Sequence, residues 1–408
     1  MAFNEKYALM ANITAIDIAF RIRNEGRTAT PLEIQQLRQY SGFGGIRSVL
    51  LDPNRPDTWA KGRLEMLPTV QLLHDTIRQH VPDDKQFDRI IARLKESTAT
   101  AFYTPESFIQ ALGTTLVKVT GQIPRTLLEP SAGHGRFLRL FDATTGAADI
   151  RTTAYEKDFL TGIVLTALNP STQVNIQGFE EFPKDKEGTY DMVVSNIPFG
   201  NVRIYDPALA KSKDPARRQA THTLHNYFFV KALDAVRNGG LVAFITSRGV
   251  AESDTNRPIR EYLVNHANLV SGIRLNDDLF SNDGIAEVGT DLLIFQRNDN
   301  KRELSEDEKL FIETSELQYT VRNSGSDEQR DIIDLLKTQA RNHYFNQDVD
   351  KNYLWNNEDT SHKHTLGYPQ GDDTDRFGNL YVQWQVDEDY WEQSVEEELA
   401  GGNLAPKP

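Results

Sequence analysis

Short β-branched runs alternate with helix-like segments through the middle of the chain. From Thr126 to Arg297 the apolar runs are TLLEP, TTAYEKD, QVNIQGF, DMVVSNI, LVAFITS, LVSGIRL and TDLLIFQR. The helix-like segments GRFLRLFDA, FLTGIVLTAL and LHNYFFVKALDAVRN separate the first five runs. This alternation predicts a doubly wound α/β sheet. No long helix lies between the last two runs, so we expect an antiparallel hairpin at one edge.

The regions on either side have a different character. Residues 1–97 show helical spacing in ITAIDIAFRIRNE and PLEIQQLRQY, and YSGFGGI interrupts them with a flexible turn. After residue 300, LSEDEKLFIETSELQYTVRNSGSDEQRDIIDLLKTQA is compatible with a strand and a helix. Acidic residues and scattered aromatics follow. We therefore expect a helical N-terminal region (1–97), the sheet domain (98–300) and an acidic, partly ordered C-terminal region (301–408).

Composition narrows the class of protein. The chain has no cysteine, no run of 18 apolar residues and no signal-peptide pattern at its start, so we expect a cytoplasmic protein outside the membrane. The net charge is −14, of which −13 lies in residues 301–408 and only −1 in residues 1–300. A nearly neutral body can bind a polyanion through a local basic surface.

Two strand ends suggest a nucleotide-like ligand, because such sheets bind ligands at the carboxyl ends of their strands. In LLEPSAGHGRFL, Gly133 and Gly135 follow a strand and allow a tight turn close to a ligand. An ordinary strand–helix turn is the alternative. Glu156 ends the next strand, where a carboxylate can bind ribose hydroxyls, although a glutamate alone at this place is more often a solvated strand end. No Gly-x-x-x-x-Gly-Lys segment indicates an ATP site.

The stretch DMVVSNIPFG, Asp191 to Gly200, carries the most specific signal. NIPF at Asn196–Phe199 resembles the Asn-Pro-Pro-aromatic motif of S-adenosylmethionine-dependent amino-methyltransferases, and EPSAGHG resembles their cofactor loop. TAFYTP at Thr100–Pro105 resembles the Phe-Tyr-Thr-Pro element of DNA adenine-N6 methyltransferases. HNYFFVKALDAVRNGGLVAFITSRG and GIRLNDDLF…GTDLLIFQR resemble their later motifs. The resemblance covers about residues 98–297, in the motif order of the gamma group.

This resemblance implies a class I methyltransferase fold, a Rossmann-like doubly wound sheet, with S-adenosyl-L-methionine as cofactor. An aspartate that commonly contacts the cofactor's adenine aligns with Gly178, so Glu180 or Gln177 would replace that contact. We also expect Thr104 to be the N-cap of a helix, which is compatible with cofactor contact, and a buried helical ring is the alternative for Phe228. The implied cofactor-binding residues are Phe102, Tyr103, Thr104, Pro105, Glu129, Pro130, Ser131, Gly133, Gly135, Glu156, Phe179, Asn196 and Phe228.

The chemistry of adenine explains the catalytic motif. The exocyclic nitrogen is a poor nucleophile because its lone pair is delocalised into the ring, and oxygen acceptors on its two N–H groups can localise that lone pair. By the resemblance, the Asn196 side chain and the main-chain carbonyl of Ile197 are these acceptors. Pro198 stiffens the turn and Phe199 stacks on an extruded base. Ile197 replaces the usual first proline, which leaves the turn geometry open.

DNA is the implied substrate and partner. NVRIYDPALAKSKDPARRQATH carries Arg203, Arg217 and Arg218, which we expect to contact phosphates, with a solvated loop as the alternative. SRGVAESDTNRPIR adds further arginines at the same edge. Phe280 would supply a second face for the base, or else be a core residue of the hairpin. The acidic C-terminal region would repel phosphates, so recognition comes from the N-terminal region or a protein partner, or the tail regulates the cleft.

The sequence therefore predicts an adenine-N6 DNA methyltransferase that flips its target base and needs no metal. YSGFGG resembles an element of large phage and mobile-element methylases. A restriction-modification partner, an orphan enzyme and a mobile-element enzyme are not distinguished. The alternatives are a non-catalytic cofactor- or DNA-binding protein of anti-restriction or assembly, and a methyltransferase for RNA guanine or protein glutamine.

Overall fold

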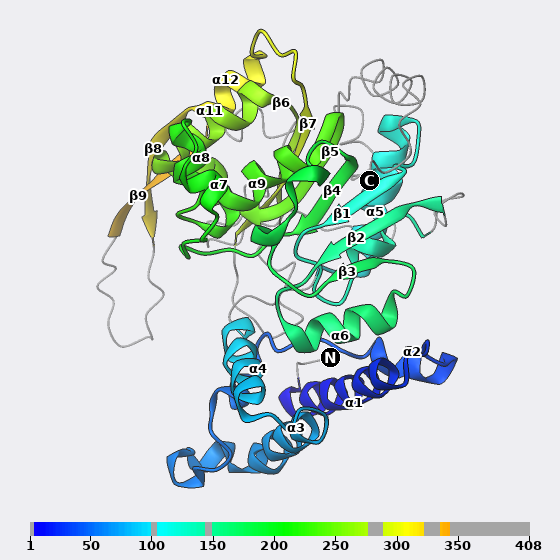
Figure 1. The fold of residues 1–408 in the computed structure, drawn as a ribbon. Coiled ribbons are helices and arrows are strands. Elements are labelled where there is room, and N and C mark those ends of the chain that lie inside the picture. The colour runs from blue at the N-terminus through cyan, green and yellow to red at the C-terminus, as the bar shows by residue number, and fades with distance from the viewer. Residues whose placement is uncertain (1–3, 99–103, 143–148, 276–288, 322–334, 343–408) are drawn as a thin grey trace.

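A twisted sheet forms the centre of the protein (Figure 1). The computed structural model describes residues 4–98, 104–142, 149–275, 289–321 and 335–342. The strands of the main sheet are β1 (Thr126–Glu129), β2 (Arg151–Tyr155), β3 (Gln173–Asn175), β4 (Tyr190–Asn196), β5 (Val236–Ser247), β6 (Ala267–Leu275) and β7 (Thr290–Arg297).

The strand order of this sheet is β3-β2-β1-β4-β5-β7-β6. Strands β1 to β5 pair in parallel, and β7 pairs antiparallel with both β5 and β6. The predicted doubly wound sheet with an antiparallel edge hairpin is thus confirmed. In β4 the first six residues are buried, as expected for a central strand covered on both faces.

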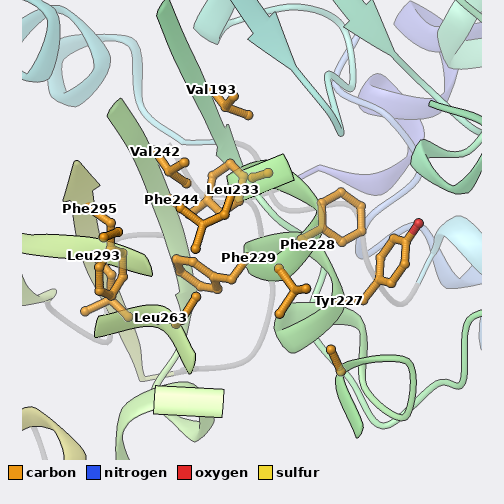
Figure 2. Packing of buried hydrophobic residues seen from close by; sticks show 14 of the residues in the cluster. Val193, Tyr227, Phe228, Phe229, Leu233, Val242, Phe244, Leu263, Leu293 and Phe295 are labelled. Atoms are coloured by element: carbon orange, nitrogen blue, oxygen red, sulfur yellow. The ribbon is translucent and has the colours of Figure 1, made fainter. Parts of the chain in front are cut away.

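Helices cover both faces because alternate residues of the strands point to opposite sides. On one face α5 (Glu106–Thr120) packs through Phe108 and Leu112. On the other, α9 (Leu224–Ala235) and α11 (Arg257–His266) share a core with the strands. Phe229 of α9 meets Phe244 of β5 with ring centroids 5.1 Å apart (Figure 2). This packing fixes the start of α9 beside the end of β4.

Several predicted elements have different bounds. GRFLRLFDA contains only a 3-10 turn at Phe137–Arg139, because the amides of Phe137 and Leu138 point to the Glu129 carboxylate. The helix predicted through Asn238 ends at Ala235, and β5 starts there because Val236 pairs with Tyr190. Helix α11 was not predicted. Beyond residue 300 the structure has α12 (Glu306–Ile312), followed by the paired strands β8 (Thr314–Val321) and β9 (Leu335–Asn342).

The N-terminal region is helical, as predicted. It contains α1 (Glu5–Glu25), which Asn4 caps through its side chain and Gly26 ends at φ +62°, and α2 (Pro31–Leu37), α3 (Leu67–His80) and α4 (Asp84–Ser97). These helices lie beside α6 (Phe159–Leu168) at the β3 edge of the sheet (Figure 1). One hydrophobic cluster joins them to α6 through Leu160, Ile163 and Val164. The region therefore shares its core with the sheet domain.

The remaining short α-helices follow β4 and β5 in the chain. No helix among the described residues is long and apolar enough to cross a membrane. These short helices are α7 (Pro207–Ala210), α8 (Pro215–Ala220) and α10 (Gly249–Glu252).

Candidate active site

The predicted site residues gather at the carboxyl ends of the parallel strands. β1 lies between β2 and β4, so the ends of these three strands are neighbours. Glu129, Glu156 and Asn196 end or directly follow them. The Ser195 hydroxyl donates to the Ser131 carbonyl at 3.2 Å, which joins the end of β4 to the loop after β1. The structure therefore places the glycine turn beside the NIPF turn.

The loop after β1 needs both glycines. Gly133 has φ +55° and Gly135 has φ +86°, in the left-handed region that side chains disfavour. A Cβ on Gly135 would also lie 2.7 Å from Leu165 and 2.8 Å from the Asn169 side chain. The Gly133 amide donates to Glu156 at 2.8 Å. The glycines thus let the backbone turn back against the end of β2.

Glu156 is part of this loop rather than a solvated strand end. One carboxylate oxygen accepts from the Gly133 amide and the other from the Asp158 amide, at 2.8 and 2.7 Å. Burial, and then the neighbouring Asp158 carboxylate, raise the pKa of Glu156 to about 8. When ionised, each oxygen keeps a second lone pair for a ligand hydroxyl, and when protonated the group can also donate one hydrogen bond.

Two buried oxygens lie ready for a donor. Glu129 Oε2 and Thr104 Oγ1 have no hydrogen-bond partner among the described residues, and both side chains are almost fully buried. Burial, together with Glu156, raises the pKa of Glu129 well above its usual range. Arg136 donates to the Thr104 carbonyl at 2.9 Å, which brings Thr104 to the loop. Because buried polar groups are normally paired, these oxygens fit a ligand with an ammonium or hydroxyl group.

The start of α5 differs from the expected cap. Pro105, not Thr104, occupies the N-cap position, and no side chain caps this helix. The N-cap role suggested for Thr104 is therefore wrong, since the chain enters α5 one residue later. Phe102 and Tyr103 of the same element lie outside the described residues. Pro130 lies in the loop between Glu129 and Ser131, as predicted.

An aromatic pair lies next to the end of β3. Phe179 and Phe228 have ring centroids 5.6 Å apart and an angle of 32° between their planes. Both are buried, and they come from segments about fifty residues apart in sequence. The neighbouring Glu180 carboxylate lies 3.0 Å from Lys157 Nζ, so it is paired with a lysine. The two rings that the resemblance assigns to the adenine side are thus in contact with each other.

The NIPF turn is built on both the strand and the core. Asn196 is the last residue of β4 and is half-buried. Ile197 is 1% exposed in the main core, and its amide donates to the Ile245 carbonyl at 3.1 Å. Pro198 and Phe199 are half-buried. Burial of the Ile197 side chain and its bond to β5 fix the turn where the family motif has a proline.

The basic side chains of the following loop have different surroundings. Arg217 donates two 2.7 Å hydrogen bonds to Asp234 and a third to the Tyr262 hydroxyl. The predicted contact between Arg217 and a DNA phosphate is therefore wrong, because its guanidinium is already paired within the protein. Arg218 is exposed and donates to the carbonyls of Ser212 and Lys213. Arg203 is exposed. Phe280, expected as a second face for the base, lies outside the described residues.

Sequence reasoning missed the contribution of the N-terminal region to this edge. Tyr40 meets His134 of the glycine turn edge to face, with centroids 6.2 Å apart, and its hydroxyl lies 2.7 Å from Thr161 Oγ1 of α6. Buried Asn12 holds the turn after Tyr40 through hydrogen bonds with Ser41 and Gly42. The only sequence signal was YSGFGG itself, which predicted a turn and no contact.

The comparisons with known proteins agree with the resemblance. The model of the N-6 DNA methylase family matches residues 86–364, more than half of the chain. A search of curated proteins finds no match.

Solved structures with a similar fold include two bacterial proteins. One, from Listeria monocytogenes, is assigned to the class I S-adenosylmethionine-dependent methyltransferases: it is 16% identical, with 74% of this chain and 91% of that chain covered and a TM-score of 0.45. The other is the methyltransferase subunit of a type I restriction-modification system from Streptococcus thermophilus: it is 13% identical, with 72% and 80% covered and a TM-score of 0.43.

Proposed function

Because the chain belongs to the N-6 DNA methylase family, we propose that Asn196 and the Ile197 carbonyl bind the amino group of its target adenine. Membership makes the protein an S-adenosylmethionine-dependent methyltransferase that methylates adenine N6 in DNA. The observation that carries the residue assignment is the Ser195–Ser131 bond, which holds the end of β4 against the glycine turn. The end of β4, which carries Asn196, thus lies beside the loop that we propose for the cofactor.

The cofactor is held, in this proposal, by four groups of residues around the glycine turn. Gly133 and Gly135 let the backbone approach it, and Glu156 accepts from its ribose hydroxyls. Phe179 and Phe228 pack on its adenine. Glu129 and Thr104 take its methionine end, because their buried oxygens have no partner among the described residues. When bound, S-adenosylmethionine supplies a methyl group on a positively charged sulfur.

The protein's own part in the reaction is to orient and polarise the amine. The Asn196 side-chain oxygen accepts one N–H and the Ile197 carbonyl accepts the other, so the nitrogen lone pair turns out of the ring plane towards the methyl group. Ile197 supports this role, because its side chain is anchored in the core and its amide is bonded to β5. Phe199 stacks on the base, which must leave the duplex to reach this turn.

A protein partner that supplies sequence recognition is part of the proposal. Six large hydrophobic side chains of the N-terminal region are exposed, which favours a protein contact on that region. These residues are Tyr7, Met10, Leu32, Leu50, Leu64 and Leu72. With recognition supplied by a partner, the isolated chain methylates adenines in many sequence contexts. If the isolated chain methylated adenine in one sequence context only, the proposal that a partner supplies recognition would be contradicted.

The function is tested with S-adenosylmethionine labelled on its methyl group and equal amounts of duplex DNA, RNA and protein as acceptors. We expect label on DNA, recovered as N6-methyladenine after hydrolysis to nucleosides. Label on RNA or protein would assign another acceptor. Cofactor binding without any transfer would indicate a binding module instead of an enzyme.

A further inference from the structure

Two exposed hydrophobic side chains follow the NIPF turn. Val202 is 57% exposed and Tyr205 is 84% exposed. In the described part of residues 104–314 these are the two large hydrophobic side chains that are exposed, whereas every other one is at least partly buried. An exposed aromatic ring beside a binding site can serve as a stacking surface for a nucleic-acid base. Their position directly after the proposed catalytic turn therefore points to a ligand contact.

The backbone of this segment is held firmly on both sides. The Leu224 amide donates to the Gly200 carbonyl at 3.0 Å, and the Ile204 amide donates to the Thr221 carbonyl at 2.9 Å. Ile204 packs against the main core between the two exposed residues. The outward direction of Val202 and Tyr205 is thus set by inward-facing neighbours.

A buried carboxylate anchors the far end of the segment. Asp206 is 2% exposed and accepts from the Tyr227 hydroxyl at 2.9 Å and from Lys231 Nζ at 3.1 Å. It also caps α7 through the amides of Ala208 and Leu209. An ion pair on the inside of the loop fixes Tyr205, the preceding residue, on the outside.

The segment follows the proposed base-binding ring in the chain and carries exposed positive charges. Tyr205 lies six residues after Phe199, so their Cα atoms are at most about 20 Å apart. The same loop exposes four cations, Arg203, Lys211, Lys213 and Arg218. The negative charge of buried Asp206 is paired with Lys231. This combination of a ring, an aliphatic side chain and exposed cations fits a nucleic-acid duplex.

We propose that Tyr205 and Val202 enter the base stack of the DNA next to the extruded adenine. An extruded base leaves its neighbours unstacked, and an inserted ring replaces part of the lost stacking. Arg203, between them, binds the phosphate at that step. This inference rests on the proposed function, since it needs a base that leaves the duplex.

The test compares Tyr205→Ala with Tyr205→Phe on two duplexes that each contain one methylatable adenine. In the first duplex that adenine is paired with thymine, and in the second it faces an abasic site, where extrusion costs less. We expect Tyr205→Ala to lower kcat/KM about 10-fold on the paired duplex and less than about 3-fold on the abasic one. Tyr205→Phe keeps the ring and should stay within about 2-fold of the unchanged protein.

Tyr7→Ala is the matched control in this assay of the isolated chain without a protein partner, because Tyr7 is also exposed but lies in α1. Cofactor affinity and melting temperature should not change in any of these variants. If Tyr205→Ala lowered kcat/KM equally on both duplexes, or did not lower it on the paired duplex, the proposal that the Tyr205 ring enters the base stack would be overturned. If the unchanged protein fails to methylate either duplex, the proposed function fails first, and the two failures are thereby distinguished.

Discussion

The two halves of the catalytic edge differ in what their side chains contact. Around the ends of β1 and β2 the polar groups bond to one another: Glu156 binds two backbone amides and Arg136 binds Thr104. After β4 the side chains open outwards, from half-buried Phe199 to Tyr205 at 84% exposure. In the proposed function, the backbone of the cofactor half would therefore be set before a ligand binds, whereas the target half would be completed by DNA.

The largest expected effect breaks the target half alone. Asn196→Ala removes one acceptor of the adenine amine, so methyl transfer should fall at least about 100-fold. Cofactor affinity should stay within about 2-fold, because the glycine turn is untouched. Rates under single turnover and calorimetric titration with cofactor measure the two effects. Transfer at the unchanged rate would remove Asn196 from the chemistry.

An alanine at Gly135 breaks the cofactor half instead. Its φ of +86° and the close Leu165 and Asn169 side chains oppose any Cβ, so the cofactor dissociation constant should rise about 10-fold or more. Gly200→Ala is the matched control, since Gly200 also has positive φ (+136°) but a Cβ there would come no nearer than 3.9 Å to the side chains of Leu224 and Val202 in the target half. Titration of both variants should show weaker cofactor binding for Gly135→Ala only. If both variants bound the cofactor equally weakly, the cofactor half and the target half would not be independent of each other.

The pH dependence of stability sharpens the picture of the cofactor half. The pKa of Glu156 is about 8 in the folded protein, above its ordinary value, so between pH 4.5 and 8 the folded protein holds a proton that the unfolded chain has lost. Its contribution to stability therefore declines as the pH rises through this window and is smallest above pH 8.

Glu156→Gln stays neutral, so its unfolding free energy relative to the unchanged protein should gain roughly 4 kcal/mol between pH 5 and pH 8.5. Urea unfolding at several pH values measures the gain. Glu181→Gln, an exposed carboxylate after β3, serves as the control and should show no such gain. A constant difference across this range for Glu156→Gln would contradict the proton uptake.

The smallest expected effect concerns the N-terminal support of the glycine turn. Tyr40→Phe loses the 2.7 Å bond to Thr161 but keeps the ring beside His134. The cofactor dissociation constant should rise about 3-fold, whereas kcat at saturating cofactor should not change. An unchanged dissociation constant would confine Tyr40 to a role in packing.

The sequence predicted the sheet and the position of both motifs because these depend on local pattern. Parallel strands end at one edge whatever their partners are, so Glu129, Glu156 and Asn196 had to meet there. The glycine turn followed for the same reason, from residues that are adjacent in sequence.

What could not be predicted depends on partners far away in the chain. Asp234 makes Arg217 an internal residue, and Tyr40 reaches His134 from more than ninety residues away. The exposure of Tyr205 could not be predicted either, because it results from the burial of Asp206 against Tyr227 and Lys231. No local spacing encodes these three arrangements.

The central claim is that two oxygens at the end of β4 bind the adenine amine. A crystal structure with S-adenosylhomocysteine and a duplex containing one methylatable adenine tests it most directly. We expect the adenine N6 atom within about 3 Å of both Asn196 Oδ1 and the Ile197 carbonyl oxygen. An adenine amine bound by other groups, with the Asn196 side chain turned into the protein, would contradict it.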